Sequence, residues 1–173
     1  MWLLKIERVK TEAAHALEMA IKNLTDSKKV GKVGWVHASQ YIDSREYVAA
    51  VAAQNEFGNP NKHIPARPFM RPTIDQKQKE WAKIAGLGAK QILLGNQTPN
   101  DVLEILGLKA SGDIKRTISR IYEPVLSRRT IESRISRSSG RSRLNKTQAL
   151  SLTKPLIDTG IMFNTLTNVV EDE

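Results

Sequence analysis

Apolar side chains recur at three- and four-residue steps near the start of the chain and form one stripe, made of Ile6, Val9, Ala13, Leu17, Ala20 and Leu24. This period predicts a helix over residues 2–24. The segment 32–37 then places Val33 and Trp35 on the same side of an extended backbone, which predicts a strand. The first part of the chain is therefore expected to be a helix followed by a strand.

Alanines dominate residues 46–57, and no proline interrupts them. Alanine is the best helix former, so the segment is predicted to be a helix with Ser44 as its N-cap, although a strand over residues 47–51 competes with it. Gly58 and the prolines that follow are typical of a helix end. Four of the seven prolines fall within residues 59–72, which predicts a stiff, extended connection.

A helical period returns over residues 73–94, where Gly86 and Gly88 are expected to permit close packing or to mark a bend. The run Thr98-Pro99-Asn100-Asp101 has the residues of a helix start: a capping side chain, a proline at the first position and an acid in the first turn. This helix is predicted to be short and to end at Gly107.

Further elements are expected in the second half of the chain. Another helix is predicted from Ser111, and Ser127 is expected to cap a short helix over residues 128–135. A short helix from Thr159 and a strand over residues 166–170 then complete the fold. Leu156, Ile157, Ile161, Leu166 and Val169 are the apolar cluster that must return to the core.

Basic side chains gather late in the chain, at Arg128, Arg129, Arg134, Arg137, Arg141, Arg143 and Lys146. Residues 136–149 are rich in serine and arginine, and they have too little apolar surface to offset the entropy of ordering. A mobile basic arm is therefore expected at about residues 134–152. Residues 1–173 are otherwise predicted to form a single structural domain of the α+β class, in which a small antiparallel sheet packs with several helices.

The net charge of +9 favours a polyanionic partner, such as nucleic acid or an acidic protein surface. The chain has no cysteine, which excludes disulfides, thiol nucleophiles and cysteine-based zinc sites. No apolar run approaches the roughly 20 residues that cross a bilayer, so no membrane is expected and the protein is predicted to be made and used in the cytoplasm.

Sequence motifs for catalysis or cofactor binding are weak throughout the chain. The three histidines His15, His37 and His63 lack the spacing of a metal site, and the glycine clusters fit neither dinucleotide-binding nor P-loop patterns. Carboxylates are expected on solvated helix faces or at caps, namely Glu12, Glu18, Asp75, Glu80 and Asp101. We therefore predict no catalytic, cofactor or metal site and no enzyme, although an acid–base pair can also form from residues distant in sequence.

Two segments resemble one protein family. The run VAAVAAQNEFGNP of residues 48–60, continued by IPARPFMRP of residues 64–72, resembles a signature of bacteriophage minor tail, or virion-morphogenesis, proteins. The run LSRRTI of residues 126–131, followed by KPLIDTGIM of residues 154–162, is similar to the ending of the same family. The chain departs from the family at Val125, where proline is frequent, and in the long basic stretch 133–153.

The resemblance implies an α+β structural protein of the virion, a tail-completion or neck ring of six copies at the head–tail junction. It implies no catalytic residues; the partners would be other copies, the neighbouring connector and tail proteins, and double-stranded DNA passing through the lumen. The residues that carry it are candidates for subunit interfaces or scaffold: Asn55, Glu56, Phe57, Gly58, Ile64, Pro65, Arg67, Pro68, Phe69, Arg71, Pro155, Leu156, Asp158, Thr159 and Gly160.

Specific roles follow for several of these residues. Arg67 and Arg71 are expected to pair with carboxylates, either Glu56 or those of a neighbouring subunit. Phe57 and Phe69 are expected to anchor in apolar pockets, and the Asp158-Thr159 pair to cap the last helix. The seven basic residues between 128 and 146 are candidates to face DNA. The alternative function is a small, basic, sequence-independent nucleic-acid-binding protein that uses the arm directly.

Overall fold

The computed structural model describes residues 12–25, 28–138 and 152–172. Its helices are α1 (Glu12–Thr25), α2 (Val48–Phe57), α3 (Met70–Leu93), α4 (Pro99–Arg120), α5 (Arg128–Ser138) and α7 (Ile161–Asn164), with a 3-10 turn η1 (Pro60–Lys62). Strands β1 (Lys29–Gly34) and β2 (Thr167–Asp172) form a two-stranded antiparallel sheet. The predicted α+β class, a small antiparallel sheet with several helices, is confirmed.

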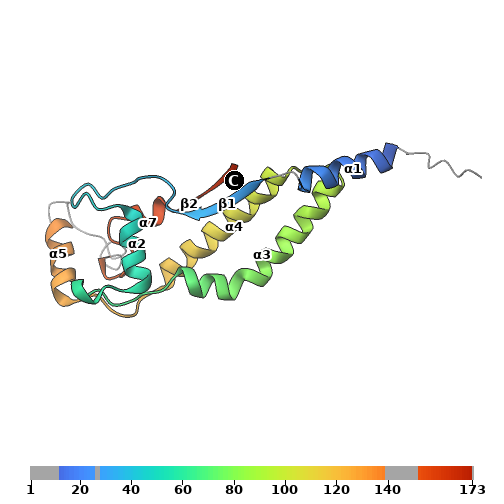
Figure 1. Ribbon diagram of the computed structural model, residues 1–173. Helices are drawn as coiled ribbons and strands as arrows, with labels where there is room; N and C mark the ends of the chain where they lie inside the picture. The colour runs from blue at the N-terminus through green and yellow to red at the C-terminus, as the bar shows by residue number, and fades with distance from the viewer. Residues whose placement is uncertain (1–11, 26–27, 139–151, 173) are drawn as a thin grey trace, which may run out of the picture.

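The molecule is elongated around a helical hairpin (Figure 1). α3 and α4 run antiparallel, and the β1–β2 ribbon lies along α4 on the side away from α3. α1 packs at the far end of α3, whereas α2, α5 and α7 gather at the other end of the hairpin. The hairpin therefore separates a compact helical end from the end that carries α1.

Close packing against α4 depends on two glycines. A Cβ atom at Gly88 would lie 2.3 Å from Cγ1 of Val102, so Gly88 lets α3 approach α4. A Cβ atom at Gly107 would lie 2.8 Å from Cβ of Asn168, so Gly107 lets β2 approach α4. The prediction that the helix ends at Gly107 and that another starts at Ser111 is wrong, because α4 continues through both residues to Arg120.

The hydrophobic core lies at the helical end and draws on distant parts of the chain. Its buried members are Val48, Ala52, Phe69, Ile114, Ile118, Leu156, Met162 and Leu166. Phe69 is fully buried, and its ring meets Trp35 edge to face with 5.9 Å between centroids. The Trp35 indole N–H also donates to the carbonyl oxygen of Met162 at 2.9 Å. Leu156 and Leu166 return to the core with Ile157 and Ile161 packed against them, as predicted, whereas Val169 lines a surface groove instead.

Several predicted boundaries shift. β1 covers residues 29–34, three positions before the predicted 32–37. The segment after Ser44 is a helix and not the competing strand, but Ser44 does not cap it. Its hydroxyl accepts from the backbone N–H of Glu46, whereas the N-cap residue of α2 is Tyr47, without a side-chain bond. Residues 2–11 of the predicted first helix lie outside the described residues.

Helix α3 begins at Met70 rather than at residue 73 and so includes Pro72. A proline is tolerated in the first turn because its missing N–H has no partner within the helix there. The predicted starts at Thr98 and Ser127 are confirmed: Thr98 forms a capping box with Asp101, and the Ser127 hydroxyl accepts from the backbone N–H of Thr130 at 3.2 Å.

Candidate interaction site

The first family-like segment folds around one buried carboxylate, that of Glu56 at the end of α2. Its oxygens accept the backbone N–H groups of Phe69, Met70 and Arg71 at 2.6, 2.9 and 3.1 Å, and the Nε of Arg71 at 3.0 Å. Glu56 thus satisfies three of the N–H groups at the start of α3, which have no acceptor within that helix. It ties α2 directly to the N-terminus of α3.

Burial by itself raises the pKa of the Glu56 carboxyl, but the backbone N–H groups of Met70, Phe69 and Arg71 and the Arg71 guanidinium together lower it below its ordinary value. Glu56 therefore stays ionised at neutral pH. As predicted, Arg71 pairs with Glu56, and its guanidinium also lies over the Phe57 ring at 4.9 Å. Phe57 itself is two-thirds exposed rather than anchored within the subunit.

Gly58 allows the chain to turn sharply between α2 and the proline-rich segment. Its φ of 78° lies in the region that favours glycine, and a Cβ atom would lie 2.9 Å from the backbone nitrogen of Ala66. The backbone N–H of Arg67 then donates to the carbonyl of Asn55 at 2.7 Å. The proline-rich segment therefore folds back on α2.

Arg67 joins the first family-like segment to the residues just before the second. Its Nε donates to the carbonyl of Pro124 at 2.7 Å, and its Nη2 to that of Val125 at 3.2 Å. Burial lowers the pKa of Arg67 from its ordinary value, which is far above neutral, so the side chain remains a cation. The expectation that Arg67 pairs with a carboxylate is wrong within the subunit, because this cation satisfies backbone carbonyls.

Arg134 of α5 is buried among the carbonyl groups of the second family-like segment. Its Nη1 donates to Leu152, Lys154 and Ile157, and its Nη2 to Pro155. Its Nε lies 3.5 Å from the Asp158 carboxylate. Burial lowers the pKa of Arg134, while the charge of Asp158 acts to raise it. Arg134 thus holds the returning chain in place.

Arg134 is therefore buried and not free to face DNA, contrary to the prediction, whereas Arg137 belongs to α5 rather than to an arm and keeps a half-exposed side chain. Arg137 donates to Asp158 at 2.7 Å, and the two residues belong to α5, which extends to Ser138. Arg128 pairs with Glu132 on the exposed surface of the same helix, and Arg129 is exposed. The other three candidates, Arg141, Arg143 and Lys146, lie outside the described residues.

Asp158 has a different role from the predicted one. α7 has Gly160 as its N-cap residue, with a φ of 79° and no capping side chain, so the Asp158-Thr159 pair does not cap it. The Thr159 hydroxyl does contact the start of α7, where it accepts from the backbone N–H of Ile161 at 3.4 Å. Asp158 instead binds the two arginines of α5, Arg134 and Arg137.

A groove of about 830 Å³ opens where the two family-like segments meet. Many of the residues singled out from the sequence line it: Asn55, Ile64, Pro65, Arg67, Arg129, Arg134, Arg137, Pro155, Leu156, Asp158 and Thr159. Glu56 and Phe69 lie beneath it in the interior, and Pro68 is exposed on the outside. We call this region the signature junction. It gathers residues from α2, the proline-rich segment, α5 and the segment before α7.

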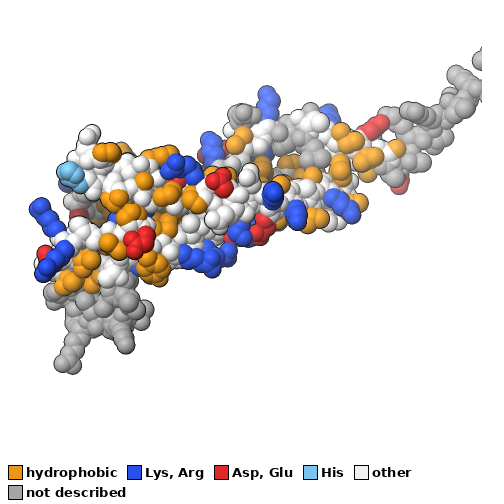
Figure 2. Space-filling model, turned by 90° about the horizontal axis from the view of Figure 1, so that it is seen from below, with side chains coloured by type: hydrophobic (Ala, Val, Ile, Leu, Met, Phe, Trp, Pro, Cys, Tyr) orange, Lys and Arg blue, Asp and Glu red, His pale blue; other side chains and the backbone are white. Residues whose placement is uncertain are grey.

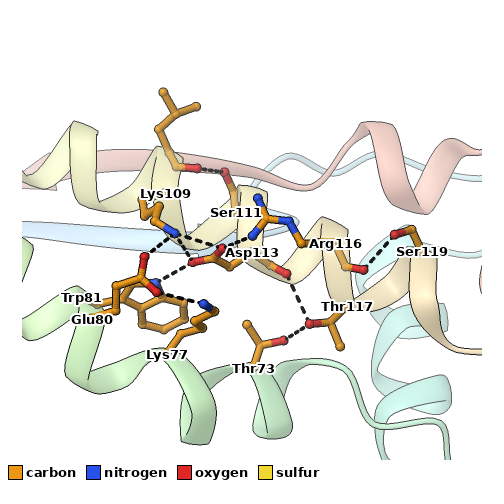
Figure 3. Close-up of polar contacts among 11 residues, drawn as sticks. Thr73, Lys77, Glu80, Trp81, Lys109, Ser111, Asp113, Arg116, Thr117 and Ser119 are labelled. Atoms are coloured by element: carbon orange, nitrogen blue, oxygen red, sulfur yellow. Dashed lines mark hydrogen bonds and ion pairs between the residues drawn. The ribbon is translucent and has the colours of Figure 1, made fainter.

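A second polar cluster joins α3 to α4 along the hairpin (Figure 3). The buried Asp113 carboxylate accepts from Nε1 of Trp81 at 3.0 Å, from Lys109 at 3.0 Å and from Arg116 at 2.7 Å. Lys109 also contacts Glu80 at 2.7 Å. Glu80 was expected on a solvated face, and its side chain is 43% exposed, whereas the buried Asp113 was not predicted, although it lies next to Ile114 among the apolar positions of α4.

Burial raises the pKa of Asp113, but hydrogen bonds from Trp81 and Lys109 and the nearby positive charges lower it below its ordinary value. The pKa of Glu80 is also lowered, by hydrogen bonds from Lys109 and Lys77. The cluster therefore links α3 to α4 through ionised carboxylates that already accept hydrogen bonds from side chains of the same chain.

Within the residues that the structure describes, no group of three or more histidine, aspartate and glutamate side chains could hold a metal ion. In the same residues, no helix is long and apolar enough to cross a membrane. Comparison of the chain with protein-family models, with curated proteins and with solved structures gives no match.

Proposed function

We propose that the protein is a structural subunit of a tailed-bacteriophage particle and that it forms the ring that completes the tail at its head-proximal end. The observation that carries the proposal is the signature junction. The two segments that resemble phage minor tail proteins are distant in sequence, yet Arg67 of the first binds the backbone just before the second. Phe69 of the first and Leu156 of the second belong to one core cluster.

The state of the buried carboxylates supports a scaffold role. A general acid or base works best with a pKa near the operating pH and with a free site for the proton. Glu56 and Asp113 have lowered pKa values and are surrounded by N–H donors from their own chain. Such carboxylates fasten elements together, which suits a protein whose work is done by its surfaces.

The surface offers apolar area for partners. Among the described residues, the large apolar side chains that are more than half exposed are Ile42, Tyr47, Phe57, Leu87, Leu94, Leu108, Tyr122 and Val125. They are distributed along the elongated molecule, and Figure 2 shows apolar side chains interspersed with lysines and arginines on the face seen from below. Exposed apolar side chains of this extent suit a subunit that contacts other copies and neighbouring virion proteins.

The alternative of a nucleic-acid-binding protein that acts through its basic arm loses one of its seven candidate contacts, the buried Arg134. Arg134 is bound by backbone carbonyls inside the subunit, and Arg137 pairs with Asp158 but keeps a half-exposed side chain. A positively charged lumen that DNA traverses remains part of the proposed function, because the net charge is +9. The proposed virion location and the ring of six copies rest on the resemblance to phage minor tail proteins.

Complementation of defective particles tests the proposal. The phage or prophage that encodes this chain is induced with the gene deleted, and purified protein is added to the lysate. We expect the deletion to lower the titre by several orders of magnitude and to leave separate heads and tails in electron micrographs. Added protein should restore joined particles. A normal titre without the protein would refute the proposed function.

A further inference from the structure

We propose that copies of this chain join head to tail by strand addition, with the outer edge of β2 in one copy pairing with the outer edge of β1 in the next. The inference rests on the proposed function, because it names the contact that would build the ring. It is carried by three features of the ribbon: two open edges, opposite charge along them, and apolar side chains beside each edge.

In the part of the chain that the structure describes, no strand pairs with either outer edge of the ribbon. The six residues of β1 pair with the six of β2, from Lys29 opposite Asp172 to Gly34 opposite Thr167. Among the described residues, no backbone hydrogen bond joins either strand to any other segment. About half of the backbone groups of each strand therefore point outward, ready for a further strand. Neither strand contains the proline that often blocks such an edge.

The two edges carry opposite charge. β1 contributes Lys29 and Lys32, and β2 contributes Glu171 and Asp172. Within the subunit these side chains already pair, Lys29 with Asp172 and Lys32 with Glu171, yet all four remain between one-third and four-fifths exposed. Two like edges would repel each other, whereas the basic edge of one copy attracts the acidic edge of another. Edge lysines, which usually discourage pairing, here discourage only the wrong pairing.

Apolar side chains also lie next to each of the two strands. Beside β2, a groove of about 650 Å³ is lined by Asp101, Glu104, Ile105, Leu108, Asn168, Val169 and Val170. Ile105 and Leu108 are 47% and 69% exposed there. Glu104 of this groove extends the negative edge along α4, whereas Asp101 lines both this groove and the one beside Lys29 of β1.

Beside β1, the corresponding feature is α1. A groove of about 860 Å³ is lined by Met19 of α1 and Lys29 of β1, together with residues at the tip of the hairpin. Met19 is 47% exposed, and Ala16 and Ala20 on the same face of α1 line the groove with it. An apolar helix face next to a basic strand thus matches an apolar groove next to an acidic strand.

The occupant of each edge is therefore a second copy of this chain. A contact between two different surfaces is heterologous, and repeated heterologous contacts close into a ring or continue as a filament. In such a ring, the two-stranded ribbons would form one continuous sheet. The main-chain bonds would supply affinity, and the charges would fix the direction of addition.

Three surface variants test the contact without touching the internal ion pairs. Leu108→Arg blocks the acidic side, Met19→Glu blocks the basic side, and Leu87→Arg is the matched control on α3, with its wild-type side chain 66% exposed. Circular dichroism and thermal melting establish that all three fold. Native mass spectrometry and sedimentation velocity then measure self-association of the full chain.

We expect wild type and the control to form the same closed oligomer, and each blocked variant alone to associate at least tenfold more weakly. An equimolar mixture of the two blocked variants has one intact pair of edges, so it should form a heterodimer and nothing larger. Hydrogen exchange of the wild type should slow in both β1 and β2 on assembly.

The inference is overturned if the blocked variants assemble like wild type, if their mixture stays monomeric, or if exchange in the strands is unchanged. A wild type that remains monomeric at high concentration also overturns it. If the blocked variants assemble like wild type and wild-type protein still restores joined particles in the lysate, the proposed function stands and only the contact is wrong. If wild-type protein restores nothing, the proposed function fails.

Discussion

Removal of the charge of Glu56 should weaken the whole helical end of the molecule. In Glu56→Gln the side chain keeps its shape, but the amide retains one acceptor oxygen where the carboxylate had two. Each carboxylate oxygen accepts two hydrogen bonds, so one pair of donors loses its acceptor. A hydrogen bond to a charged group contributes about 1.5–3 kcal/mol, and the partly exposed Arg71 contributes the least of the four.

The expected loss in free energy of unfolding is therefore about 3 kcal/mol at neutral pH, a large share of the roughly 5–15 kcal/mol of a typical domain. Urea unfolding followed by far-UV circular dichroism measures it. The matched control is Glu46→Gln, which removes a half-exposed ion pair with Lys62 and should cost less than about 1 kcal/mol.

The pH dependence gives a sharper test of the same reasoning. The pKa of Glu56 is lowered in the folded state, so its charge stabilises the protein above the unfolded value of 4.5, and this contribution disappears as the pH falls through the folded pKa. The difference between wild type and Glu56→Gln should therefore shrink steadily in acid. Equal stabilities at neutral pH, or a difference that does not change in acid, would refute the account.

Three other substitutions test the packing. Phe69→Ala should cost about 3–5 kcal/mol of unfolding free energy, since the ring is fully buried. A mutant that melts like wild type would instead favour a Phe69 side chain that contacts a partner. Gly88→Ala should lower the melting temperature through a clash with Val102, whereas Gly86→Ala, which meets open space, should raise it slightly; equal shifts would contradict the tight hairpin contact. Asp113→Ala should cost about 2–4 kcal/mol in chemical denaturation because an indole N–H and two cations lose their acceptor, and an unchanged midpoint would show that the cluster is dispensable.

The sequence predicted best what depends on neighbouring residues. The helix start at Thr98 follows from a hydroxyl, a proline and an acid within four positions, so no distant contact was needed to find it. The helix over most of residues 46–57 follows from alanine content. The return of Leu156 and Leu166 to the core follows from their apolar character in a polar stretch.

The errors arise where a distant contact reverses a local preference. Gly107 resembles a helix stop, but α4 needs a glycine there so that Asn168 can approach. Pro72 resembles a barrier to a helix, but it lies in a first turn whose neighbouring N–H groups are satisfied by Glu56. Arg134 looks like one more cation in a polar run, and only the fold reveals that four carbonyls surround it.

The candidate site was predicted as a set of residues but not as an arrangement. The family-like segments identified Glu56, Arg67 and Asp158, and all three make specific contacts at the signature junction. Their partners could not be named beforehand, apart from the pairing of Arg71 with Glu56. Backbone carbonyls carry no sequence signal, so an arginine that binds them cannot be distinguished from one that faces solvent or DNA.

If copies join by strand addition as proposed, the pairing of β1 with β2 also determines when in folding the protein becomes able to assemble. Lys32 and Glu171 are 139 positions apart, whereas α3 and α4 are consecutive helices that can find each other early. Contacts between such distant residues form slowly, because a long loop must close first. A growing chain on the ribosome therefore has no ribbon until residues 167–172 have emerged and docked. Truncated products would lack the acidic edge altogether, so the proposed strand addition could start only after β2 has formed and paired with β1.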